Sequence, residues 1–220
     1  MTTTTLYRLS AAALVSSFLL SLAGGVLHPV VDGHSHSVDA FLAPRSPEAQ
    51  YLIYAGAVLL MLGLPGGYLF FRASLGRTGF VGFTLYMVGN ALSAMSHLVV
   101  EAFVGPTLAG DPDARHLVSD QDEIFEATSF VTLQAVGGLV FLAGLLLVGI
   151  ALVRAADVPT WVGVLVVAGA LALVVPFPER PGLTGLLVEL PRGTMAATLG
   201  VLMWRRVVRE PVREREPALT

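Results

Sequence analysis

The sequence lacks cysteine and lysine and has few charged residues of any kind. All 13 basic residues are arginine, and charged residues make up only 13% of the chain. Without cysteine there is no disulfide, thiolate ligand or cysteine nucleophile, so any metal chemistry has to use histidine and carboxylates. Without lysine there is no phosphate-binding loop of the kind that needs one. The net charge of −3 argues against a nucleic-acid partner.

Hydrophobic residues fill the chain instead, at 55% of the total, with a mean hydropathy of +0.75. A membrane-spanning helix needs about 20 apolar residues. Five charge-free runs reach that length, and a sixth segment does so although it contains Glu189, Pro191 and Arg192. The sequence therefore predicts an all-α polytopic membrane bundle of six transmembrane helices and a charged cytoplasmic tail. The expected bounds are about 9–31, 49–71, 78–104, 124–153, 158–178 and 182–204 for the spans and 205–220 for the tail.

Six crossings with both termini in the cytoplasm leave nine arginines inside and four outside, which agrees with the positive-inside tendency. The same sorting puts twelve acidic residues and all five histidines outside, where the net charge is −8. Such a surface attracts cations. We expect a multi-pass protein of a prokaryotic plasma membrane, in contact with the lipid bilayer. Alternatively, the first segment is a signal peptide with a cleavage site at Ser21-Leu22-Ala23.

A polar stripe on the third span is the strongest functional signal. Its members are spaced 4, 3, 4 and 4 residues apart, so they share a helix face of about 80°. They are Tyr86, Asn90, Ser93, His97 and Glu101. Since unsatisfied polar groups are costly in lipid, this face should line the bundle interior or a hydrated cavity.

The first span carries a matching face of small and polar residues that ends in a histidine. It consists of Ser10, Ser17, Ser21, Gly24 and His28. Small residues allow helices to approach closely. His28 and His97 each lie three residues inside the outer end of their charge-free run, so we expect the two imidazoles at similar depth.

Other candidates lie at the outer end or within the last segment. His34 and His36 follow Asp32-Gly33 in a loop, and Glu126 shares a face of the fourth span with Gln134. Glu189 and Arg192 can neutralise each other across one helix turn. The last segment is either a broken helix of the kind that lines transporter sites, or a short interfacial helix at 182–190 before a shallow span.

The leading hypothesis is a cation site for a divalent metal or for protons, formed by His97 and Glu101 with His28 and Glu126. His34 and His36 would act as an outer relay or lid. A second hypothesis is an electron carrier that binds haem b between His28 and His97. A third is an accessory or scaffold protein whose polar faces bind a second copy or a partner subunit. No catalytic nucleophile is recognisable, so the sequence does not favour an enzyme.

Overall fold

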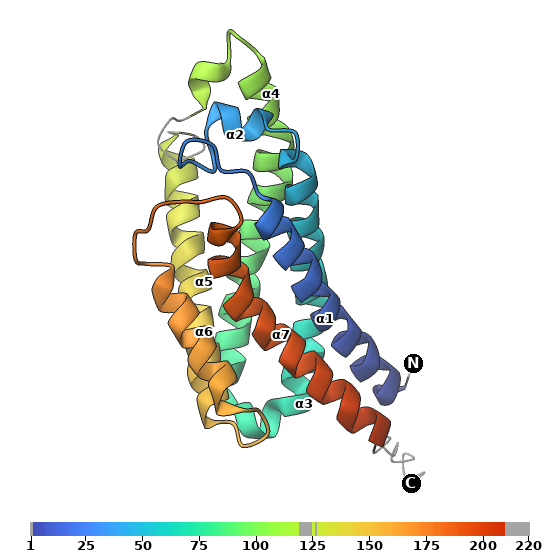
Figure 1. Cartoon of the computed structure of the whole chain (residues 1–220). Coiled ribbons are helices and arrows are strands. Elements are labelled where there is room, and N and C mark those ends of the chain that lie inside the picture. The colour runs from blue at the N-terminus through green and yellow to red at the C-terminus, as the bar shows by residue number, and fades with distance from the viewer. Residues whose placement is uncertain (1, 119–124, 126, 210–220) are drawn as a thin grey trace.

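The chain folds into a long helical bundle with a small helical cap at one end. The computed structural model describes residues 2–118, 125 and 127–209, and over these residues it is helical without a β-sheet, as the sequence predicts (Figure 1). The elements are α1 (Thr3–Leu27), α2 (Val38–Leu42), α3 (Ser46–Met95), the π-helix η1 (Ser96–Val104), α4 (Gly105–Gly110), the 3₁₀-helix η2 (Arg115–Leu117), α5 (Thr128–Arg154), α6 (Thr160–Ala172) and α7 (Leu183–Arg209).

Among the described residues, four helical segments are long and apolar enough to cross a membrane: α1, the continuous stretch Ser46–Gly110, α5 and α7. These apolar helices indicate a multi-pass membrane protein. The count differs from the predicted six spans in two places. The stretch Ser46–Gly110 includes two of the predicted spans, and α6 is shorter than the span predicted at 158–178.

The stretch Ser46–Gly110 reverses direction within α3. Gly76 leaves the helical conformation with φ 58° and ψ −157°, values that favour glycine because it lacks a side chain. Beyond this residue the chain runs back beside itself (Figure 1). The two arms contact each other at Tyr68 and Phe80, whose ring centroids lie 5.6 Å apart, and at Asn90, which donates a 3.2 Å hydrogen bond to the Ala57 carbonyl. α3 is therefore an antiparallel pair of helical arms.

The early end of α6 has a cause in the sequence. The predicted span at 158–178 contains Pro176 and Pro178, and a residue before proline is disfavoured in the α conformation. The helix stops at Ala172, and the chain continues through a turn and an irregular segment to α7. At about 1.5 Å per residue, 13 helical residues span about 20 Å, which is less than the ~30 Å hydrocarbon core.

The last segment forms one helix, so it does not divide into an interfacial helix at 182–190 and a separate span. α7 passes through Pro191 without a break and continues to Arg209, five residues past the predicted end of the span at 204. The Pro191 ring lies against Gly169 of α6. Tail residues 210–220 lie outside the described part of the chain.

Small residues bring α1 close to α3, as its sequence predicts. Ser10, Ser17 and Ser21 are buried, and a Cβ added to Gly24 would lie 2.8 Å from the Ala49 carbonyl oxygen. This close approach sets the end of α1 beside the first turn of α3. His28 follows α1 directly and therefore reaches the residues of that turn.

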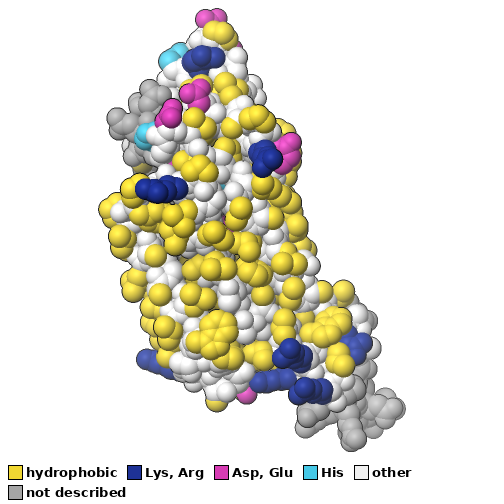
Figure 2. Space-filling model, viewed as in Figure 1, with side chains coloured by type: hydrophobic (Ala, Val, Ile, Leu, Met, Phe, Trp, Pro, Cys, Tyr) yellow, Lys and Arg dark blue, Asp and Glu magenta, His cyan; other side chains and the backbone are white. Residues whose placement is uncertain are grey.

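The cap end of the molecule, which carries α2, α4 and η2, lies opposite the chain termini (Figure 1). Phe41, Ala109 and Val118 form its small hydrophobic core. On the face shown in Figure 2, hydrophobic side chains cover the middle of the bundle. Histidine and most acidic side chains on that face gather toward the cap end, and several arginines lie near the termini.

Candidate metal centre

His28 is positioned by the end of α1 and by its own chain neighbour. Its Nδ1 lies 3.1 Å from the Pro29 carbonyl oxygen, which can only accept a hydrogen bond. Nδ1 therefore carries the proton, and Nε2 presents its lone pair. Nε2 accepts a hydrogen bond from the Gln50 amide at 2.9 Å and also lies 3.3 Å from Oε2 of Glu101. A backbone carbonyl on one ring nitrogen is the usual device that orients a metal-binding histidine.

A tight turn brings His36 back toward His28. Asp32 and Gly33 have φ values of 52° and 87°, which is typical of the two central residues of a type I′ turn. Val31 and His34 close the turn with backbone hydrogen bonds of 3.0 and 2.9 Å. After the turn, the His36 ring centroid lies 5.8 Å from that of His28.

The start of α2 fixes the other side of His36. Ser37 caps α2 by accepting a 3.2 Å hydrogen bond from the Ala40 amide, so the helix begins immediately after the histidine. His36 Nε2 lies 3.5 Å from Glu101 Oε2. The histidine is thus held between a turn and a helix start, both of which are defined by the local sequence.

His97 and Glu101 lie on the π-helix η1. Their nearest atoms, Nδ1 and Oε1, are 3.1 Å apart, and Glu101 is only 3% exposed. The widened turn of a π-helix changes which side chains share a face, and such turns occur frequently at functional sites. The sequence stripe predicted that these two residues lie together. It did not indicate the π conformation.

Gln50 is the member of the site that the sequence analysis missed. It is 1% exposed and lies in the first turns of α3, where its Oε1 accepts a 2.7 Å hydrogen bond from His97 Nδ1 while its amide donates to His28. A signal was available. Gln50 is a lone amide in the otherwise apolar run at 49–71, and a buried polar side chain in a membrane helix needs a partner.

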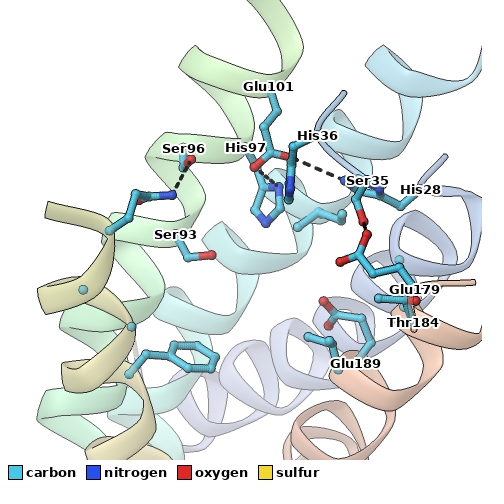
Figure 3. A pocket seen from close by; sticks show the side chains of 18 of the residues that line it. His28, Ser35, His36, Ser93, Ser96, His97, Glu101, Glu179, Thr184 and Glu189 are labelled. Atoms are coloured by element: carbon cyan, nitrogen blue, oxygen red, sulfur yellow. Dashed lines mark hydrogen bonds and ion pairs between the residues drawn. The ribbon is translucent and has the colours of Figure 1, made fainter. Parts of the chain in front are cut away.

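His28, His36, His97 and Glu101 together form what we call the His/Glu cluster (Figure 3). Within it, His28, His36 and Glu101 each offer one ligand atom, and these three atoms lie within 4.8 Å of one another. Tetrahedral ligands at about 2.0–2.1 Å from a zinc ion are themselves about 3.3 Å apart. The two distances from Glu101 Oε2, 3.3 and 3.5 Å, already match this spacing.

A cavity of about 580 Å³ opens beneath the cluster, between α1, α3, α5 and α7. Ser93 and Ser96 lie on its wall, and Gln134 of α5 donates a 3.3 Å hydrogen bond to the Ser96 hydroxyl. At the far side of the cavity, Arg192 pairs with Glu189 through two hydrogen bonds, of which the one from Nε to Oε2 is 2.8 Å long. Both residues are buried.

The remaining stripe residues have structural partners. Tyr86 is fully buried and packs on Phe141 with ring centroids 5.2 Å apart, while Asn90 holds the two arms of α3 together. Glu126, which the sequence placed in the cation site, lies outside the described residues. His34 takes part in the β-bridge that closes the turn and is not a member of the three-ligand group.

The chain matches no protein-family model, no curated protein and no solved structure. Its function therefore has to be argued from the site alone. Gln50 hydrogen-bonds to both His28 and His97, so haem between the two rings would require this side chain to move, as would a metal ion on Nε2 of His28.

Proposed function

We propose that the chain is a six-span membrane protein that binds a divalent metal ion through His28, His36 and Glu101. One observation carries the metal proposal: three ligand atoms from three separate elements converge within 4.8 Å. The ligands come from the end of α1, the loop before α2, and η1. Ligand atoms from three separate elements can meet only when the chain is folded, whereas acidic residues on one surface loop are neighbours in any case.

The donor set favours zinc or a similar transition metal. Two imidazoles and one carboxylate form the set found in many zinc sites, and calcium and magnesium prefer oxygen ligands alone. Three protein ligands leave one coordination position open, on which a water or an outside ligand can bind. His97 acts as a positioning residue because it contacts both Glu101 and Gln50.

The proposed topology has the two arms of α3 as separate spans and α6 as a short fifth span. Both termini then lie on the same side. Most arginines of the bundle, among them Arg8, Arg72, Arg77 and Arg154, lie near helix ends on that side, which supports a cytoplasmic placement by the positive-inside tendency. The metal site would face the opposite side of the cell membrane.

The test is metal binding by the purified full-length chain, made without a histidine tag. Elemental analysis and a zinc titration are performed on the wild type and on the ligand variants His36→Ala and Glu101→Gln. We expect about one zinc ion per wild-type chain and loss of that ion in both variants, since each removes one of three ligands. His116→Ala is the matched control, because His116 is exposed on η2 and outside the His/Glu cluster.

Equal zinc stoichiometry and affinity in the wild type and the ligand variants would overturn the proposal. A wild-type chain that binds no zinc, copper or manganese would do the same, and would leave His28, Glu101 and His97 as candidate groups for proton binding instead. Far-UV circular dichroism on each variant shows whether a loss of metal reflects a loss of fold.

A further inference from the structure

The short helix α6 leaves the cavity open on one side of the bundle. α6 packs against both α5 and α7, which barely touch each other within the described residues. Because α6 ends at Ala172, none of the described helices fills the space between α5 and α7 over the half of the bundle nearer the cap. The cavity reaches the surface there, since Ala135 and Gly138 of α5 line it and are exposed.

Most of the surface beside this opening is apolar, although Glu179 and the exposed Arg180, in the segment after α6, also line the cavity. Exposed hydrophobic residues flank the opening on α5 and α7 and at the start of the segment that follows α6. They are Leu133, Val136, Leu139, Leu183, Leu186, Leu187, Val174 and Val175. In Figure 2, hydrophobic side chains cover most of the surface along the middle of the bundle. The apolar part of this surface suits contact with lipid acyl chains.

The cavity is polar at its two ends, with the Glu189–Arg192 ion pair at the far side, and apolar between them. Ile53, Leu92, Val131, Phe141 and Val188 contribute apolar wall, and the His/Glu cluster lies at the end nearest the cap. Figure 3 shows His36, His97 and Glu101 directed toward one another at that end. A volume of about 580 Å³ is within the ordinary range of small-molecule sites.

We propose that this cavity binds a membrane lipid, which enters sideways between α5 and α7. Its acyl chain occupies the apolar part, and a phosphoryl or carbonyl oxygen of its head group takes the open position of the metal. The head-group contact rests on the proposed metal site, whereas the acyl-chain contact does not.

A photoreactive lipid tests this assignment. The full-length protein is reconstituted into phosphatidylcholine vesicles containing a small fraction of phosphatidylcholine with a diazirine on one acyl chain, irradiated, and mapped by mass spectrometry. We expect label on Ile53, which lines the cavity and is only 4% exposed, so lipid surrounding the protein does not reach it. Leu139, which is 67% exposed, reports that surrounding lipid.

Two variants close the cavity and one matched variant does not. Ala135→Phe adds a ring at the opening, and Gly138→Leu adds a side chain where a Cβ would meet no atom within 4 Å. Val136→Phe is the control, because Val136 neighbours Ala135 on α5 and is 52% exposed but does not line the cavity. We expect a several-fold loss of Ile53 label in the first two variants and none in the control.

The results separate this proposal from the metal proposal. Zinc content is measured on each sample, with and without a chelator. Label on Ile53 that the two closing variants reduce supports the lipid site even in a chain that binds no zinc. A zinc-loaded chain with label on Leu139 but not on Ile53 overturns the lipid site and leaves the metal site standing. Equal Ile53 label in Ala135→Phe and Val136→Phe also overturns it.

Discussion

The buried ion pair on α7 gives a quantitative test of whether water reaches the far side of the cavity. Glu189 and Arg192 are 3% and 9% exposed, and the guanidinium also lies 5.6 Å from the centre of the Phe141 ring. The perturbation is a set of three variants: Glu189→Leu, Arg192→Met and the double variant. Leucine and methionine keep an apolar side chain of related size at each position.

The structure sets the expected magnitudes. Removing one partner leaves the other charge buried without its counter-ion, which costs about 3–5 kcal/mol. Replacing both removes the charges together, and such replacements are often neutral or stabilising. At about 2–4 °C of melting temperature per kcal/mol, each single variant should lose about 6–20 °C. The double variant should melt at a higher temperature than either single variant.

The assay is thermal unfolding of the purified chain in detergent at one fixed heating rate, followed by circular dichroism. Two outcomes would refute the reasoning. If the loss in the double variant equals the sum of the two single losses, the pair is not coupled. If Glu189→Leu lowers the free energy of unfolding by less than about 1 kcal/mol, water reaches Arg192 through the cavity and screens its charge.

The remaining predictions concern the metal centre. His97→Ala should weaken zinc binding about 10–100-fold without changing the stoichiometry, because His97 orients Glu101 and is not one of the three proposed ligands. A zinc titration measures the affinity, and an unchanged affinity would contradict the positioning role. Gly33→Ala should weaken zinc binding because a side chain at φ 87° costs about 1–2 kcal/mol and disturbs the turn that carries His36. Gly110→Ala is its control, since neither glycine has an atom near an added Cβ and only Gly33 has a positive φ; equal affinities in the two variants would show that the turn does not hold His36.

Helical periodicity predicts part of the site, namely the positions of His28, His97 and Glu101. The 100° rotation per residue put His97 and Glu101 on one face, and equal distances from two helix ends put His28 at the depth of His97. In the structure both histidines contact Glu101, at 3.3 and 3.1 Å. Periodicity works here because lipid forces a polar stripe inward.

Other parts of the site depend on features that periodicity does not describe. Whether His34 or His36 reaches the cluster is decided by a type I′ turn at Asp32-Gly33, a dipeptide that is itself a known turn signal. Gln50 stands alone in its run and has no stripe to mark it. Pro176 and Pro178 end α6 and so create the opening of the cavity. Because they carry no charge, they do not interrupt the charge-free run that predicted a span at 158–178.

The distance in sequence between the ligands has a consequence for how the protein is made. His28 and His36 leave the ribosome long before Glu101, and the site exists only after both arms of α3 lie beside α1. The proposed metal would therefore bind only to a chain whose first three hydrophobic segments are already assembled. At a free metal concentration 100 times the dissociation constant, binding would stabilise the assembled form by about 2.7 kcal/mol. Metal supply would then control the yield of assembled protein in the membrane.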